Sequence, residues 1–297
     1  LHTLASELKA QGKFDEAEPL YREVLEVSLA AFGDRHPNTL ASISNLGLLL
    51  HNKGDHAAAE PLLREALEVF RETLGIRHPN TLTSMSNLGV LLMAKGDLAA
   101  AELLYREAVE ALRETLGNRH PSTLLSVNNL GLLLEAKGDL AAAELLLREA
   151  LEVFRATLGS RHPNTLISIG NLGALLYSKG DHAAAEPLLR EALEVTRETL
   201  GDRHPSTLNS IGNLGTMLYS KGDLTNAELL LREALEVLRE TLGNRHPSTL
   251  ASISSLGTLL QDKGDLAAAE LLLREALVGY RETLGARHPN TLASINQ

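Results

Sequence analysis

The chain has 297 residues, of which 44% are hydrophobic but only 3% aromatic, and its formal net charge is −10. This acidic balance offers no basic surface for nucleic acid or an anionic membrane, and no apolar run approaches the roughly 20 residues of a membrane span. The lack of cysteine excludes disulfides and thiolate metal sites and is compatible with a reducing cytosol, so we expect a cytoplasmic protein.

A nearly identical unit recurs every 42 residues along the chain. An Arg-His-Pro motif marks each unit, with its histidine at His36, His78, His120, His162, His204, His246 and His288. A turn glycine recurs with the same period, at Gly12, Gly54, Gly96, Gly138, Gly180, Gly222 and Gly264. Repeats of this length stack as a solenoid, because one unit alone cannot bury its apolar face. We therefore expect a single array over residues 1–297, a fragment of about seven units in which the first and last are partial.

The unit at residues 33–74 predicts two helices, and the first, the A helix, begins at Pro37. Proline fits the first position of a helix, and the residue before it is held out of the helical region, as an N-cap must be. Apolar residues then follow helical spacing, at Leu40, Ile43, Leu46, Leu49 and Leu50. Gly54 can take the left-handed conformation that ends a helix.

The second helix of the unit, the B helix, is predicted to begin after Asp55 as N-cap and to stop at Gly75. Its expected inner side is Ala59, Leu62, Leu63, Ala66, Leu67, Phe70 and Leu74, and its outer side is Glu60, Arg64, Glu65, Glu68, Arg71 and Glu72. We interpret the outer stripe as a solvated face, in which the Glu60–Arg64 pair contributes a few tenths of a kcal/mol. Pro61 and Pro187 stand inside B helices and should bend them.

A glycine occupies the middle of the A helix in six units, where it costs roughly 1 kcal/mol relative to alanine. These residues are Gly47, Gly89, Gly131, Gly173, Gly215 and Gly257. The repeated cost indicates that the B helix of the same unit approaches closely there. We expect the small residue twelve positions later, Ala59 in the first of these units, to supply the contact.

Leu46, Gly47 and Leu50, followed by Ala59 and Ala66, resemble the tetratricopeptide repeat. The 42-residue unit with L-G-x-R-H-P-x-T-L-x-S-x-x-N-L-G resembles the kinesin light chain type of that repeat, over the whole chain, although this chain is far more self-identical and has no heptad region. The resemblance implies an all-α fold, a right-handed superhelical solenoid of antiparallel helix pairs. It also implies a protein-interaction scaffold, without enzymatic activity or cofactor, in which the A helices line a concave groove.

Five positions of the A helix differ between units, those of Ala41, Ser44, Leu48, His51 and Asn52. The resemblance places them in the groove. Either binding or drift after duplication explains the variation; the unvarying Arg64, Glu65 and Arg71 columns favour binding, since drift would have scattered them too. With the asparagine column, the candidate partner-binding residues are Asn45, Asn87, Asn129, Asn171, Asn213, Leu48, His51, Met93, Leu132, Glu135, Tyr177, Tyr219 and Gln261.

Two interpretations of the asparagine column stay open. In the family, the equivalent residue often hydrogen-bonds the backbone of a bound peptide. Alternatively, the asparagines bond to Ser42 and its equivalents in a ladder between neighbouring A helices. A buried amide needs a partner in either case.

Three basic columns are given structural interpretations. We expect the His36 column to cap helices, because equivalent positions in stacked helices lie about 8–10 Å apart, whereas metal ligands lie within about 2.1 Å of one ion. The Arg35 column, which runs to Arg287, follows the B helices and is expected to meet the negative helix end, the alternative being an anion-binding rim. Lys53 and its equivalents stand two residues from an aspartate, so we expect their field to be largely cancelled.

We therefore expect a protein or peptide to bind along a largely uncharged groove, through apolar or aromatic anchors and backbone hydrogen bonds. Tyr177 and Tyr219 are the expected aromatic anchors, whose loss should weaken binding without harming folding. No lysine or arginine stands at the five variable positions, which argues against the carboxylate clamp of chaperone-binding relatives. No catalytic pair or phosphate loop points to a small-molecule substrate. The alternative is a structural rod or spacer that associates head to tail, in which Leu292 and Ile295 are partly bare.

Overall fold

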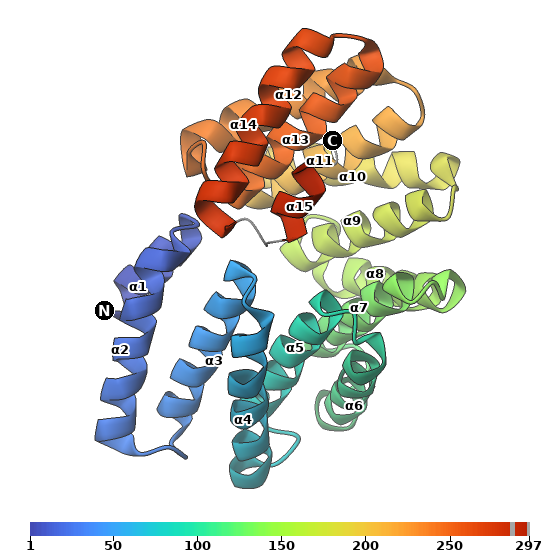
Figure 1. The fold of residues 1–297 in the computed structure, drawn as a ribbon. Helices are drawn as coiled ribbons and strands as arrows, with labels where there is room; N and C mark the ends of the chain where they lie inside the picture. Colours follow the sequence, from blue (N-terminus) through green and yellow to red (C-terminus); the bar gives the residue numbers. More distant parts are fainter. Residues whose placement is uncertain (286–288, 296–297) are drawn as a thin grey trace. The chain divides into compact units, whose positions relative to one another are not determined.

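Each 42-residue unit folds into an A helix and an antiparallel B helix, as the sequence predicts (Figure 1). The computed structural model describes residues 1–285 and 289–295, and these form helices joined by turns, with no strand. The odd-numbered helices are A helices and the even-numbered ones B helices. Their bounds are α1 (His2–Ala10), α2 (Phe14–Phe32), α3 (Pro37–Lys53), α4 (His56–Leu74), α5 (Pro79–Ala94), α6 (Leu98–Leu116), α7 (Pro121–Ala136), α8 (Leu140–Leu158), α9 (Pro163–Ser178), α10 (His182–Leu200), α11 (Pro205–Ser220), α12 (Leu224–Leu242), α13 (Pro247–Lys263), α14 (Leu266–Leu284) and α15 (Pro289–Ile295).

The chain divides into two compact units, Leu1–Leu146 and Leu147–Gln297. Within each of them, a B helix packs against the A helix that precedes it and the A helix that follows it. The fold is an all-α solenoid of tandem helix pairs. Within the described residues, no helix combines the length and the apolar character needed to cross a bilayer.

Local capping fixes the helix ends where the sequence predicts them. The imidazole Nδ1 of His36 accepts a hydrogen bond of 3.1 Å from the backbone N–H of Asn38, and the same bond recurs at His78, His120, His162, His204 and His246. The Asp55 carboxylate accepts from the N–H of Ala58 at 3.0 Å. Gly54 ends α3 in the left-handed region, at a φ of +87°. Arg287 and His288 lie outside the described residues.

The predicted apolar faces form the core. Leu40, Leu46, Leu49 and Leu50 of α3 are each at most 2% exposed. Opposite them, Ala59, Leu63, Ala66, Leu67 and Phe70 of α4 are buried, while Leu62 and Leu74 are partly buried against the same cluster. Full burial of one such leucine contributes roughly 1.5–3 kcal/mol, so each helix pair is held by its neighbours.

The mid-helix glycines do mark close approach of the B helix, but the expected contact was wrong. A Cβ at Gly47 would lie 2.8 Å from Cδ2 of Leu63, and 3.5 Å from the backbone oxygen of Ala59. The same clash would occur between Gly173 and Leu189, at 2.7 Å. The leucine one turn beyond the alanine therefore fills the space, because an alanine side chain has no atoms that reach across to the A helix.

Pro61 and Pro187 lie inside α4 and α10, which continue through them as single helices. Their register is that of Leu103 in α6, which is 71% exposed. The proline ring therefore stands at the solvent-facing side of the B helix, where it removes one backbone hydrogen bond without displacing core side chains.

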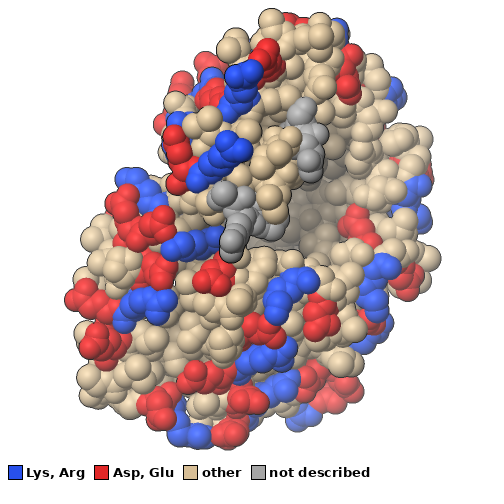
Figure 2. Space-filling model, viewed as in Figure 1, with Lys and Arg blue, Asp and Glu red and all other residues tan. Residues whose placement is uncertain are grey.

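The charged stripe of the B helices is more than a solvated face, which corrects that interpretation. Arg71 pairs with Glu107 of the next B helix, and Arg239 pairs with Glu275 at 2.7 Å. The Glu60–Arg64 pair is present as predicted. Basic and acidic side chains are accordingly intermingled on the visible surface (Figure 2). The constant columns of this stripe therefore join successive repeats.

The arginine and lysine columns also pair across repeats, contrary to expectation. Arg35 binds Glu72, 37 residues later, at 2.7 Å, so its partner is a carboxylate of the next B helix. Lys95 binds Glu60 of the preceding B helix, and Lys221 binds Glu186 at 2.6 Å. The expected cancellation by a nearby aspartate was wrong, because stacking brings a glutamate 35 residues away closer to the ammonium group.

Candidate binding site on the A helices

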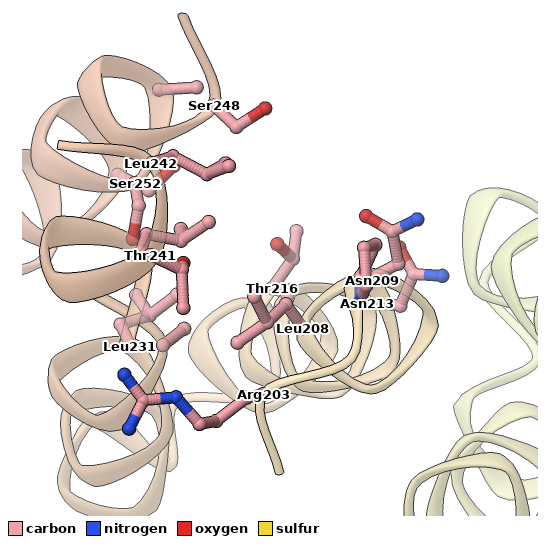
Figure 3. A pocket seen from close by; sticks show the side chains of 16 residues that line it. Arg203, Leu208, Asn209, Asn213, Thr216, Leu231, Thr241, Leu242, Ser248 and Ser252 are labelled. Carbon is pink, nitrogen blue, oxygen red and sulfur yellow. The ribbon is translucent and has the colours of Figure 1, made fainter. Parts of the chain in front are cut away.

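A cavity of 490 Å³ lies between the successive A helices α11 and α13. Its floor is apolar and comes largely from α12, with Leu231, Ala234, Leu238 and Leu242. Figure 3 shows labelled side chains of α11 on one side and those of α12 and α13 on the other. The A helices contribute residues of three variable columns: Asn209 and Ala251 of the first, Gly212 of the second and Thr216 of the third. They also contribute Asn213 and Ser255 of the asparagine column.

A second cavity, of 270 Å³, lies between α9 and α11 over Thr196 of α10. Ile167, Gly170 and Asn171 of α9 line it. Asn209 and Asn213 line both cavities, which therefore flank α11. The structure thus brings Asn171 and Asn213 together, as the repeat pattern predicts for neighbouring A helices.

The asparagine side chains do not form the proposed ladder with serine. Within the described residues, no hydrogen bond reaches the side chains of Asn45, Asn87, Asn129, Asn171 or Asn213. Ser42 instead donates to the carbonyl oxygen of Asn38 at 3.0 Å, and Ser210 donates to that of Ser206 at 3.0 Å. These two serine hydroxyls donate to the carbonyl oxygen four residues earlier and not to an asparagine amide. The ladder interpretation was therefore wrong, and the asparagine amides stay available for a ligand.

Tyr177 and Tyr219 occupy the carboxyl ends of α9 and α11, away from the two cavities. The Tyr177 hydroxyl bonds to Ser220 on the next A helix, and the Tyr219 hydroxyl donates to Asp262 on the A helix after that. The bond to Asp262 raises the pKa of Tyr219. Both rings are partly buried against the core. The expected anchors therefore join successive A helices, because a phenol at this register reaches the fifth variable position one repeat later.

His51 is half-buried at the end of α3 and stacks on His56, with ring centroids 5.2 Å apart. Burial, aided by the charges of His56 and Lys9, lowers the pKa of His51. Met93 and Glu135 are half-buried at the equivalent places in α5 and α7, and Gln261 is exposed on α13.

Leu48 and Leu132 are half-buried on α3 and α7, at the register of Thr216. Like the rest of α3, α5 and α7, they belong to the compact unit Leu1–Leu146, whereas both cavities lie in Leu147–Gln297. The candidate residues are therefore divided between the two compact units.

The A-helix pattern missed the contribution of the B helices to this site. Leu231, Leu238 and Leu242 form the cavity floor, and Thr196 lines the second cavity. The apolar spacing of the B helix predicts that the leucines point inward. The spacing alone indicates a place in the core and does not show that they line a cavity. Ser252 lines the first cavity, and its buried hydroxyl has no partner among the described residues.

The polar lining of the site is uncharged apart from one arginine. Its polar groups are amides and hydroxyls, and its charged member, Arg203, pairs with Glu240 at 2.8 Å. Within the described residues, no group of three or more His, Cys, Asp or Glu side chains is placed to hold a metal ion. The arrangement presents hydrogen-bond donors and acceptors beside an apolar floor.

Comparison with known proteins matches the chain to the tetratricopeptide repeat model over residues 1–63, 40–114, 87–156, 122–198, 168–240 and 207–282. No curated protein matches the sequence. A solved kinesin light chain-like protein of Podosopora anserina, with nearly identical TPR-like repeats, is 29% identical, with a TM-score of 0.56 over 69% of this chain and 97% of its own.

Two more distant structures share the fold. BtubC (BKLC) from P. vanneervenii is 20% identical, with a TM-score of 0.58 over 80% of this chain and 92% of its own. The Rap conjugation gene regulator of the plasmid pLS20, solved in complex with the Phr* peptide, is 16% identical. Its TM-score is 0.65 over 94% of this chain and 72% of its own.

Proposed function

Because this chain belongs to the tetratricopeptide repeat family, we propose that it is a protein-interaction scaffold that binds an extended peptide segment across α9, α11 and α13. The observation that carries the proposal is the pair of cavities that flank α11 and share Asn209 and Asn213. An extended peptide has backbone groups that need partners along its length. Unpartnered amides at repeat spacing, above an apolar floor, suit such a ligand.

The fold likeness to a protein solved with a peptide is consistent with this function, although at 16% identity it concerns the fold. The remaining candidates, Asn45, Asn87, Asn129, Leu48 and Leu132, lie on A helices of the other compact unit, where we propose a surface of the same kind. The cytoplasmic location and the lack of cofactor, nucleic-acid and membrane binding stay predictions from the composition.

A selection from a random peptide library displayed on phage tests the proposal. Peptides recovered on the purified chain are labelled, and their dissociation constants are measured by fluorescence anisotropy. The double variant Asn171→Ala, Asn213→Ala should weaken binding about tenfold, because two hydrogen bonds contribute roughly 0.5–1.5 kcal/mol each. Asn118→Ala with Asn244→Ala, at exposed turns after α6 and α12, is the control and should leave binding unchanged. A library without binders, or binders unaffected by the first pair, would refute the function.

A second candidate function is head-to-tail self-association, favoured by the surface beside α14 and α15. Leu292 and Ile295 are each about half exposed, as expected, and Leu266 is 64% exposed. A cavity of 350 Å³ lies there between Leu273, Leu277 and Ile295. Sedimentation velocity over a concentration series tests it: the sedimentation coefficient should rise with concentration and stop rising in Leu292→Lys, Ile295→Lys. A constant coefficient in the parent chain would exclude this candidate.

A further inference from the structure

One outward register of the B helices is apolar in every repeat, although its side chains are exposed. In α6 this register is Leu103, which has charged neighbours: Glu102 precedes it and Arg106 follows one turn later. Because the side chains lie outside the core, packing within the repeat does not explain why the register stays apolar. Its seven exposed members are Pro19, Pro61, Leu103, Leu145, Pro187, Leu229 and Leu271.

The position one turn earlier is also apolar and exposed in the compact unit Leu1–Leu146, on three successive B helices. The first two of these helices, α4 and α6, lie side by side, since Arg71 pairs with Glu107. Exposed apolar residues that stand singly are ordinary, whereas an aligned group of them marks an interaction surface. We call the six residues the outer strip: Ala57 and Pro61 of α4, Ala99 and Leu103 of α6, and Ala141 and Leu145 of α8.

A cavity of 320 Å³ opens between α4 and α6 beside the outer strip. Leu103 lines it, and so do Leu67, Leu88 and Leu92, whose side chains are buried. An apolar cavity of about 150 Å³ is enough to hold a molecule of benzene, so this cavity has room for a leucine side chain. A projecting leucine and a cavity that accepts a leucine therefore lie side by side on one surface.

The charges around the cavity balance. Arg64 and Arg71 line it together with Glu68 and Glu107. The net charge of −10 makes two copies of the chain repel each other on average, but this patch carries equal numbers of both signs. A twofold contact uses the same patch on both copies, so the patch must complement itself. The leucine, the cavity and the balanced charges meet that condition, whereas a strongly acidic or basic partner would gain little here.

We propose that two copies of the chain dimerise through their outer strips, with Leu103 of each copy in the cavity between α4 and α6 of the other. A specific interface buries about 800 Å² on each partner, more than one leucine supplies, so the contact includes the exposed faces of α4, α6 and α8. This surface is distinct from the one beside α14 and α15 and goes beyond peptide binding by the A helices.

Sedimentation velocity over a concentration series tests the dimer. The parent chain should pass from monomer to dimer and no further. Leu103→Gln should weaken dimerisation roughly a hundredfold, because a twofold contact loses the leucine twice and each loss costs about tenfold. Leu116→Gln, at the carboxyl end of the same helix, removes another exposed leucine and should leave dimerisation unchanged. Circular dichroism spectra verify that both variants are folded.

Cross-linking locates the contact. The chain has no cysteine, so Leu103→Cys and Leu116→Cys each supply a single thiol. Leu103 lines the cavity that its counterpart enters, so the two thiols at this position are close in the dimer. A short bis-maleimide should link two copies of Leu103→Cys in high yield and two copies of Leu116→Cys in low yield.

A parent chain that stays monomeric over the whole series overturns the proposal and leaves the outer strip to a different protein. Association that Leu103→Gln leaves intact, but that Leu292→Lys with Ile295→Lys abolishes, also overturns it, because the contact is then head to tail. Equal cross-linking at Leu103 and Leu116 overturns it as well, since the copies then meet without a defined interface.

Discussion

At the scale of single residues, the histidine of each described Arg-His-Pro motif caps the helix that follows it. Its Nδ1 accepts from the backbone N–H two residues later, which is otherwise without a partner in the first turn of a helix. Proline at the next position supplies the helical φ, and the histidine supplies the missing acceptor. The column is therefore explained by capping, which recurs at α3, α5, α7, α9, α11 and α13.

Loss of one cap should have a defined effect. His204→Ala removes the acceptor for the N–H of Ser206 and should lower the free energy of unfolding by about 0.5–2 kcal/mol. His204→Asn keeps a side-chain acceptor and should recover most of the loss. Urea denaturation followed by circular dichroism measures both variants. Equal stability of the alanine variant and the parent chain would contradict the capping role.

His51 should make part of the stability dependent on pH. Its pKa is lowered in the folded chain by burial first, then by His56 and Lys9, so the unfolded chain takes up this proton more readily. Its contribution is fully present above the ordinary value of about 6.5 and falls as the pH drops through that value. His51→Gln, which copies Gln261 of α13, should shrink the fall in unfolding temperature between about pH 7.5 and about pH 5.5. An unchanged fall would rule out His51 as a contributor.

At the scale of helices, contacts between successive repeats explain columns that looked merely exposed. Arg71 forms an ion pair with Glu107 of the next B helix, which explains why this column is constant. The constancy of this column therefore has a structural cause and does not discriminate selection for binding from drift at the variable positions.

The tyrosines at the ends of α9 and α11 should contribute to stability through their hydroxyls. Tyr177→Phe with Tyr219→Phe removes the bonds to Ser220 and Asp262 but keeps the rings against the core. We expect a loss of roughly 1–3 kcal/mol for two hydrogen bonds, one of them to a charged group. Chemical denaturation gives the value, and affinity for a phage-selected peptide should be unchanged. If the double variant loses affinity without losing stability, the tyrosines contact the ligand and the stabilising role is wrong.

At the scale of the whole molecule, the glutamates that bridge repeats each contribute to the free energy of unfolding, and their contributions sum along the chain. Hydrogen bonds from Lys95 first, then Arg64, lower the pKa of Glu60, and equivalent pairs lower the pKa of Glu102, Glu186 and Glu228. Carboxylates with depressed pKa stabilise the fold above their unfolded value of about 4.3, and this contribution is lost as the pH falls through the folded values.

The ladder of glutamates should therefore show in acid titration. Glu186→Gln with Glu228→Gln should lower stability at neutral pH and flatten its decline below about pH 5. Denaturation midpoints at several pH values test this, with Glu68→Gln as the control, since Glu68 forms no ion pair within the described residues. Parallel declines in the variant and the parent would show that these pairs contribute nothing.

Deletion of whole repeats should lower stability stepwise. Each helix pair buries its leucines against its neighbours, so the free energy of unfolding should fall with each 42-residue unit removed, as a sum of unit and interface terms. The unfolding midpoints of chains shortened by one and two units measure this. Midpoints independent of length would contradict a nearest-neighbour array.

The sequence by itself determined the helix pairs, their ends and their buried faces. Caps and turns such as His36-Pro37 and Gly54-Asp55 act within a few residues, and the spacing of Leu40, Ile43 and Leu46 defines one face of a helix whatever packs on it. The sequence also placed Asn171 and Asn213 on neighbouring A helices, where both line the second cavity, but it left their partners open.

Only the tertiary structure decided which residues meet across repeats. Arg35 reaches Glu72, Gly47 faces Leu63, and Tyr219 reaches Asp262 because of how the helices cross and how far each side chain extends. A column of equivalent letters fixes the position of a residue on its own helix but not its neighbour on the next. For that reason the sequence could nominate the A-helix positions, while the packing separated those that line the cavities from those that hold the repeats together.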